Sequence, residues 1–319
     1  PAGEPAGADV FAHRAGVSER RLAEAGVLGV MVLWAANFIV VKSAVAVLPP
    51  VGFTFLRFVI ASATLLLLLR WRERSIGVPR RDFVAICALG AVGFGLYQIL
   101  WTTGLTTVPA GDSALIIAST PVLVAIFAVA ARSDVLTPSK LIGAIVSFAG
   151  VGAVIASGPG LTLGRSIGGE AITLLGAGCW SFYMAFGAPY LGRYSPLRAT
   201  AWATVAGTIV LAPIAATQLA TVSTSVMTPG VLGAVLYSGF LAAGISNVVV
   251  QNGIRVVGPT RTAAYQFLVP ALAVVLAAMF LAEPIRPGQI VGGLIIVLGV
   301  LIARGSVPFR VVRVPGPRS

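Results

Sequence analysis

Charged side chains are scarce in this chain of 319 residues, because Asp, Glu, Lys and Arg together make up only 10% of it. Soluble proteins carry about 25% charged residues, and a soluble domain of this length would expose apolar patches far larger than monomers tolerate. The scarcity therefore argues against a soluble enzyme, a nucleic-acid-binding protein and a secreted scaffold. Hydrophobic residues, in contrast, make up 57% of the chain, which is typical of a protein embedded in a membrane.

Histidine and cysteine are almost absent. The one histidine, His13, lies in a polar stretch before residue 25, and Cys87 and Cys179 each lie within an apolar run. Two cysteines cannot form a disulfide framework or a four-ligand zinc site, and the apolar runs hold no histidine for a Ser-His-Asp triad. We therefore expect no cofactor, no metal and no enzymatic activity.

Apolar runs fill most of the chain and are separated by short connections that contain Pro or Gly. A transmembrane helix needs about 20 apolar residues, and in lipid each run must be helical because no water can bond an exposed backbone group. The sequence therefore predicts an all-α membrane protein with ten transmembrane helices. They are expected at residues 25–46, 51–70, 83–105, 110–131, 139–157, 169–190, 198–217, 230–252, 260–281 and 288–303.

Basic residues gather in alternate connections. If the N-terminus is cytoplasmic, nearly all of the 22 Lys and Arg residues lie on the cytoplasmic side, as short loops of membrane proteins require. Arg165, Arg286 and Lys42 then lie toward the outer side, and Arg57 lies within a span. We expect a multi-pass protein of the inner or plasma membrane with a cytoplasmic tail at 1–24, a basic cytoplasmic tail at 304–319 and no nucleic-acid partner.

The chain repeats itself once. Equivalent positions of the two copies carry the same residue at one nearly constant offset, which predicts five-helix units at 25–157 and 168–303. Because five is odd, the second unit enters the membrane from the opposite side, and inverted repeats of this kind are typical of secondary transporters. Matching pairs are Trp34 and Trp180, Pro50 and Pro196, Gly95 and Gly244, Pro121 and Pro270, and Pro138 and Pro287.

Three stretches resemble the EamA-type transporters of the drug/metabolite transporter superfamily: WAANFIVVKSAVAVLPPVGFTFLRF, PVLVAIFAVAARSDVLTPSKLIGAIVSFAGVGAVI and PALAVVLAAMFLAEPIRPGQIVGGLIIVLGVLIA. The resemblance implies export of small metabolites, often amino acids, through a central cavity between the halves. Two positions depart from the pattern. Asp134 stands where the first unit usually has Glu, and Ala203 stands in the second unit where the first has Arg57.

Arg57 and Lys42 are the notable cations of the first two spans. An ionisable residue inside a span is costly and is a functional candidate by default, so Arg57 is a candidate ligand for the substrate. The alternative is a structural role, in which its long stem reaches the interface or loop carbonyls. Lys42 would join it in an outer vestibule that attracts a carboxylate, although snorkelling is the simpler interpretation for Lys42 alone.

Aromatic and amide side chains in the spans are the other candidate substrate ligands. Trp34 and Asn37 share one helix face, and Trp180 and Tyr183 repeat their spacing in the second unit. An amide in mid-membrane needs a partner, either another helix or a substrate, and the alternative for the rings is ordinary packing. The remaining candidates of this kind are Gln98, Trp101, Asn247, Tyr265 and Gln266.

The acidic residues are expected to be structural. Asp112 fits an N-cap at the start of the fourth span, and Asp134 and Glu283 are expected at the membrane boundary. Gly143, Gly150 and Gly152 of the fifth span and Gly292, Gly293 and Gly299 of the tenth are expected to permit close helix contact.

The sequence thus favours a secondary transporter that exports small metabolites such as amino acids by alternating access. An exporter of drugs or lipophilic cations remains an alternative, although such a protein would need an intramembrane carboxylate to bind the cation. A membrane-embedded enzyme or assembly protein for lipid-linked substrates is the alternative of another class. The oligomeric state, the coupling ion and the exact substrate stay open.

Overall fold

The computed structural model describes residues 17–73, 75–131, 135, 137–157, 166–257, 262 and 265–303. Residues 1–16 and 304–319 of the predicted tails, and Asp134, lie outside the described residues. Every regular element within these ranges is a helix. In chain order they are α1 (Val17–Val45), α2 (Pro50–Arg72), α3 (Arg80–Gly90), η1 (Ala91–Leu96), α4 (Tyr97–Leu105), α5 (Ala110–Ile117), α6 (Thr120–Ala130), α7 (Pro138–Ala156), α8 (Ser166–Arg193), α9 (Pro196–Leu219), η2 (Thr224–Val226), α10 (Pro229–Leu236), η3 (Tyr237–Ile245), α11 (Ser246–Val256), α13 (Leu268–Leu281) and α14 (Pro287–Ala303).

The described part of the chain has eight helices that are long and apolar enough to cross a membrane, and two shorter apolar helices, α13 and α14, follow them. The predicted all-α membrane class is therefore confirmed, whereas the count of ten spans stays a prediction. Helix α1 begins at Val17, earlier than the predicted boundary at residue 25. Arg20 and Glu24 lie 3.5 Å apart one turn from each other, a spacing that supports a helix outside the bilayer.

Two spans change their helical winding in the middle. The span that begins with α3 passes through the π-helix η1 into α4, and the span that begins with α10 passes through the π-helix η3 into α11. A π-helix widens the turn and shifts the backbone hydrogen bonds by one residue, and such segments often occur at functional sites. The predicted run 110–131 is also interrupted, between Ile117 and Thr120, because Pro121 has no amide hydrogen to continue the helix.

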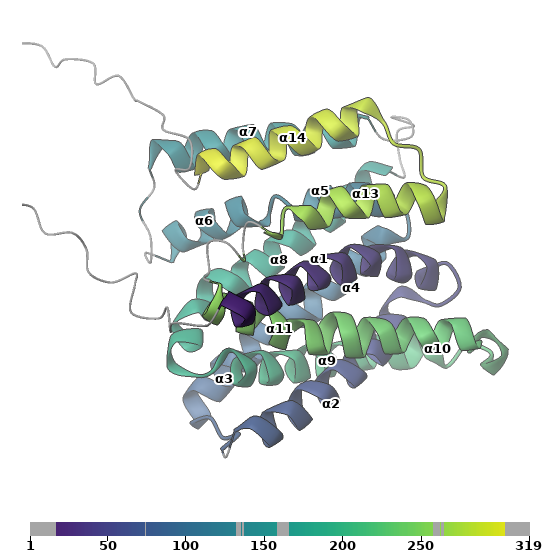
Figure 1. Cartoon of the computed structure of the whole chain (residues 1–319). Coiled ribbons are helices and arrows are strands. Elements are labelled where there is room, and N and C mark those ends of the chain that lie inside the picture. Colours follow the sequence, from purple (N-terminus) through teal and green to yellow (C-terminus); the bar gives the residue numbers. More distant parts are fainter. Residues whose placement is uncertain are drawn as a thin grey trace, which may run out of the picture.

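The spans form one bundle in which α7 packs along α14, α2 along α9 and α5 against α13. Helix α1 contacts α11 and α13, while α8 contacts α4 and α6. Helix α1 begins and α14 ends at the same side of the bundle, at the left in Figure 1. We call this side the terminal end, and the opposite side, with the connections α1–α2, α4–α5 and α13–α14, the distal end.

Glycines bring α7 and α14 into backbone contact. A Cβ atom on Gly143 would lie 2.5 Å from the carbonyl oxygen of Gly299, and one on Gly150 would lie 2.7 Å from that of Gly292. The prediction that these glycines permit close helix contact is therefore confirmed at these four positions, and a Cβ atom on Gly293 would lie 2.8 Å from Leu115 of α5. The prediction was wrong for Gly152, which has no neighbouring atom within 4 Å of such a Cβ because it lies on the outer face of the pair.

Ionic contacts hold the connections together at the terminal end. Glu73, at the end of α2, accepts bonds from Arg198 Nε at 3.0 Å and Arg198 Nη2 at 2.6 Å. Asp82 accepts a 2.7 Å bond from the hydroxyl of Tyr194, and this bond raises the pKa of that hydroxyl. The α2–α3 connection is thereby fixed to the connection between α8 and α9.

Candidate functional site

Arg57 lies at the centre of a buried polar network between the two halves of the chain. Its side chain comes from α2 and the residue is only 2% exposed. Nη1 donates to Ser238 Oγ of η3 at 2.8 Å, and Nη2 donates to Gln98 Oε1 of α4 at 2.5 Å. Ser238 Oγ in turn donates to Asn37 Oδ1 of α1 at 2.7 Å. Three of the predicted ligands, Asn37, Arg57 and Gln98, therefore meet in one network.

The close approach of α2 to η3 depends on a glycine beside Ser238. A Cβ atom on Gly239 would lie 2.4 Å from the carbonyl oxygen of Arg57, so a larger residue would push the two helices apart. The glycine thus lets Ser238 reach the guanidinium.

Aromatic rings enclose the guanidinium of Arg57. Its Cζ lies 5.9 Å from the ring centroid of Phe53, 5.1 Å from that of Phe58 and 5.4 Å from that of Trp101. Trp101 is 3% exposed, and its indole Nε1 donates to Ser113 Oγ at 3.1 Å. The network therefore lies in an aromatic surrounding that excludes water and favours a cation over the ring faces.

Trp34 and Asn37 face the same π-helix, as their shared helix face predicts. Trp34 Nε1 donates to the carbonyl oxygen of Ala242 at 3.0 Å, one turn along η3 from the Ser238 that bonds Asn37. The hydroxyl of Tyr237 in η3 also donates to the carbonyl oxygen of Leu33 at 2.8 Å. Helix α1 and η3 are therefore joined by three bonds across the bundle.

Trp180 and Tyr183 face the other π-helix. Their rings lie 5.3 Å and 5.0 Å from the ring of Phe94 in η1, and a Cβ atom on Gly93 would lie 2.3 Å from Tyr183 Cβ. Tyr97 stacks with Trp101 at 6.1 Å and lies 5.7 Å from Trp180. A continuous row of rings thus leads from Trp180 to the surroundings of Arg57.

The remaining predicted residues lie away from the network. Asn247 Nδ2 donates to the carbonyl oxygen of Ala243 in its own span at 2.5 Å. Tyr265 packs against the buried cluster of Val27 and Val30, and Gln266 is exposed. Their contact with a substrate, like that of Trp34 and Trp180, stays a prediction.

Lys42 lies at the distal end and bonds the backbone where α4 finishes. Its Nζ donates to the carbonyl oxygens of Leu105 at 2.6 Å and Val108 at 2.8 Å. A cation at this place satisfies carbonyls that have no partner within the helix. The bonds give Lys42 a structural task, and the predicted vestibule role stays a prediction.

The predicted N-cap role of Asp112 was wrong. Its carboxylate, 0% exposed, instead pairs with Arg286 and accepts a 2.8 Å bond from Gln289 Nε2. The free amides at the start of α5 are bonded by a residue from the other half: Glu283 accepts from Ala110 N at 2.8 Å and Gly111 N at 3.3 Å. The start of α5 is thus fixed to the α13–α14 connection at the distal end.

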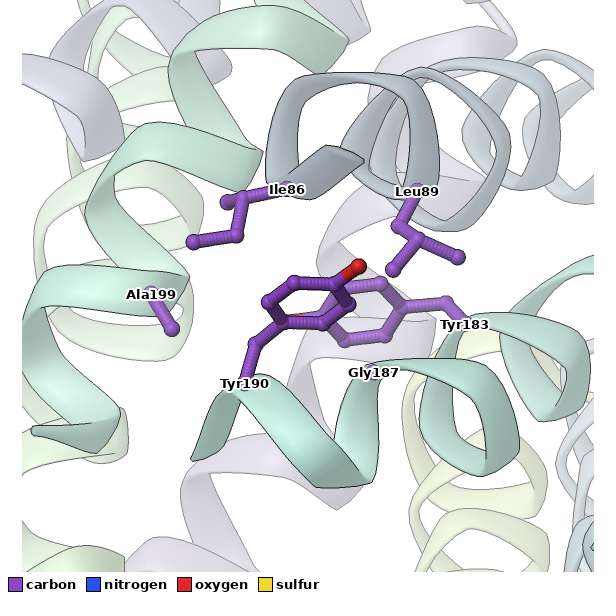
Figure 2. A pocket seen from close by; sticks show the side chains of 6 residues that line it. All are labelled: Ile86, Leu89, Tyr183, Gly187, Tyr190 and Ala199. Carbon is purple, nitrogen blue, oxygen red and sulfur yellow. The ribbon is translucent and has the colours of Figure 1, made fainter. Parts of the chain in front are cut away.

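A small pocket lies between α3, α8 and α9. Figure 2 shows Ile86 and Leu89 of α3 pointing toward the rings of Tyr183 and Tyr190 of α8, with Ala199 of α9 beside them. Its volume is about 10 Å³, roughly the room that one water molecule needs. The pocket is therefore too small for a metabolite in this conformation.

Two hydroxyl residues of the site escaped the sequence analysis, Ser238 and Ser113. Serine is common in membrane helices because it permits close packing, so neither stands out in an apolar run. The signal that could have found Ser238 is its place directly before Gly239, where a neighbouring backbone can approach. Together the site residues can bind a compact polar group between a cation, two amides and several rings.

Comparisons with known proteins identify the family. The model of the EamA-like transporter family matches twice, at residues 21–156 and 167–305. The uncharacterized transporter YyaM of Bacillus subtilis is 29% identical over 90% of this chain and 93% of its own length. A protein of Streptantibioticus cattleyicolor named a probable terminal-alkyne amino-acid exporter is 28% identical over 85% of this chain and 90% of its own length.

One solved crystal structure has the same fold. The TM-score is 0.63 at 19% sequence identity, and the match covers 90% of this chain and 99% of that one. At that identity the likeness concerns the fold alone. The double match of the family model extends over most of the chain, and the relatives are named as transporters. The chain therefore belongs to the EamA-like transporter family and is a membrane transporter rather than an enzyme.

Proposed function

We propose that this protein is a secondary carrier of the cell membrane that exports small metabolites, most specifically amino acids, by alternating access of two inverted five-helix units. The units are residues 25–157 and 168–303, and both termini are cytoplasmic. The substrate binds between the units. The buried network that joins Asn37, Arg57 and Gln98 of the first unit to Ser238 of the second carries this proposal, because it places hydrogen-bonding groups where the units meet inside an apolar bundle.

Matching contacts support the two-unit arrangement. A Cβ atom on Gly90 would lie 2.4 Å from the carbonyl oxygen of Ala203, and the equivalent Gly239 stands at 2.4 Å from that of Arg57. Helix packing also matches between the units. Helix α1 contacts α11 and α13, and its equivalent α8 contacts α4 and α6, which are the equivalents of α11 and α13. Exchanging the units therefore preserves these contacts.

The two ends of the bundle can be compared through the repeat. The residues equivalent to those of the small pocket at the terminal end include Val41, Ala44, Phe53 and Val235 at the distal end. These four are between 0% and 6% exposed and belong to one packed cluster. The pocket residues Ile86, Tyr183 and Ala199 are likewise only 3% to 6% exposed, and the distal end holds a cavity of about 60 Å³ beside Glu283 and Gln289. Neither end is therefore open to a metabolite in this conformation, and a carrier would open one end at a time during its cycle.

Two observations favour an amino acid as the substrate. One relative is named a probable amino-acid exporter, and the site combines a cation with amides and rings, which suits a carboxylate attached to a small side chain. Asp112, one buried carboxylate of the spans, is paired with Arg286 and is therefore not free to bind a lipophilic cation.

The proposal predicts efflux from liposomes that contain only the purified protein. Liposomes loaded with a labelled mixture of amino acids and other metabolites should release a defined subset faster than protein-free liposomes. An imposed pH gradient will show whether a proton is coupled, since acceleration indicates coupling and indifference indicates a facilitator.

Variants locate the site in the same assay. Gln98→Ala should slow release at least about tenfold, because it removes a hydrogen bond that positions the charged guanidinium of Arg57. Asn37→Ala should also slow release, because Ser238 loses the partner that holds it beside Arg57. Thr217→Ala is the matched control, because this exposed hydroxyl bonds only its own helix, at the carbonyl oxygen of Ile214. Unchanged release by well-folded Asn37→Ala and Gln98→Ala would place the substrate elsewhere.

A further inference from the structure

We propose that Arg57 is the specificity-determining residue for a single carboxylate on the transported compound, and that Gln98 and Ser238 hold its guanidinium when no carboxylate is bound. The inference rests on the proposed carrier function and assigns its substrate class. It predicts selection of monocarboxylates, such as amino acids, over their neutral carboxamides.

Arg57 differs from the other buried or half-buried arginines by having no acidic partner. Arg198 pairs with Glu73 and Arg286 with Asp112, and their side chains are 20% and 17% exposed. Arg57 is far more buried, at 2%, yet none of the described carboxylates forms an ion pair with it. Burying an unpaired charge is costly, and neutral hydrogen bonds recover only part of that cost. A ligand that brings a negative charge would recover the rest.

The hydrogen-bonding capacity of the guanidinium is only partly used. A guanidinium has five N–H donors in a planar fork that matches the two oxygens of a carboxylate. Here Nη1 and Nη2 each donate to one neutral acceptor, while Nε is buried without a hydrogen-bond partner. Charge-assisted bonds to a carboxylate are stronger than bonds to an amide or a hydroxyl, so a carboxylate would displace at least one of the two neutral partners.

Displacement of these partners from Arg57 would affect both halves of the carrier. Ser238 belongs to η3 of the second unit and also bonds Asn37 of α1, whereas Gln98 belongs to α4 of the first unit. A carboxylate that displaces Ser238 from the guanidinium therefore releases a bond between the units. Binding and movement are thereby linked through the same residue, as a carrier needs.

Only one such cation exists in the described site. The position equivalent to Arg57 is Ala203, which packs against Gly90 and has no functional side chain. The site is thus polar on one side and mostly aromatic on the other, around Trp180 and Tyr183. This asymmetry favours one carboxylate at Arg57 and an uncharged side chain toward the rings.

The test compares acids with their amides in competition for transport. Proteoliposomes that release a labelled amino acid are challenged with that amino acid, its carboxamide and its decarboxylated amine. In the wild-type protein the acid should compete about 10- to 100-fold better than the amide, the range for a hydrogen bond to a charged group. Arg57→Gln should abolish this ratio and Arg57→Lys should retain part of it. Arg198→Gln, which removes a paired cation at the start of α9, should leave the ratio unchanged.

The outcomes separate this inference from the proposed function. Equal competition by acid and amide in the wild-type protein, or an unchanged ratio in folded Arg57→Gln, would overturn the role of Arg57 while the carrier function stands. Transport confined to compounds that have no carboxylate would do the same. Failure of the wild-type protein to move any metabolite would instead overturn the proposed function. If Arg57→Gln does not fold, the ratio in the wild-type protein decides.

Discussion

Replacing Arg286 with glutamine is expected to lower the free energy of unfolding by about 3 kcal/mol, the scale for removing one partner of a buried ion pair. Asp112 is 0% exposed, so its carboxylate would lose its counter-charge without gaining access to water. The change should also loosen the α13–α14 connection from the start of α5. Thermal unfolding of the purified protein in detergent, followed by tryptophan fluorescence, measures the loss.

Two variants make this measurement specific. Arg193→Gln removes a cation from an exposed pair, since the side chain of Arg193 is 63% exposed, and should cost no more than about 1 kcal/mol. The double variant Asp112→Asn with Arg286→Gln removes both charges and should recover part of the stability. A loss in Arg286→Gln no larger than that in Arg193→Gln would show that the distal ion pair does not stabilise the fold.

The second large effect is expected in the contact between α7 and α14. A Cβ atom on Gly299 would lie 2.4 Å from Ser147 N and 2.6 Å from the carbonyl oxygen of Gly143. These are backbone atoms, which cannot make room by a change of rotamer as a side chain could. Gly299→Leu must therefore separate the helices, and we expect a loss of more than about 3 kcal/mol, at the upper end of the cost of overpacking.

Gly152→Leu on the same helix pair is the control, because a Cβ there meets no atom within 4 Å. It should fold normally, since leucine has the better helix propensity. The yield of monodisperse protein on size exclusion and the melting temperature compare the two variants. Equal behaviour of Gly299→Leu and Gly152→Leu would contradict the close packing of α7 on α14.

Hydropathy was sufficient to predict the membrane-embedded helical class, and the resemblance of three stretches to EamA-type transporters, two of them repeated in register, indicated the family. Both signals are local or regular along the chain: each apolar run is long enough to be recognised alone, and the residues around Pro121 and Pro270 recur in the same order. The shared face of Trp34 and Asn37 was also predictable, because helical periodicity alone places them together.

Contacts between the units could not be predicted in the same way. Arg57 bonds Ser238 across a sequence separation of 181 residues, and no local pattern indicates which of many serines will lie opposite it. Asp112 fitted an N-cap on local grounds, yet Glu283 of the other unit bonds the start of α5 and leaves Asp112 to Arg286. In both cases the partner is determined by tertiary packing, because local sequence spacing does not distinguish one possible partner from another.

A carrier whose substrate site is exposed to one side at a time should show counterflow. Proteoliposomes are loaded with an excess of the unlabelled amino acid identified by efflux, and a trace of the labelled compound is added outside. A carrier should accumulate label transiently above its equilibrium level, and Gln98→Ala should reduce this overshoot at least about tenfold. Entry of label that rises only to equilibrium, as through a channel, would contradict the account.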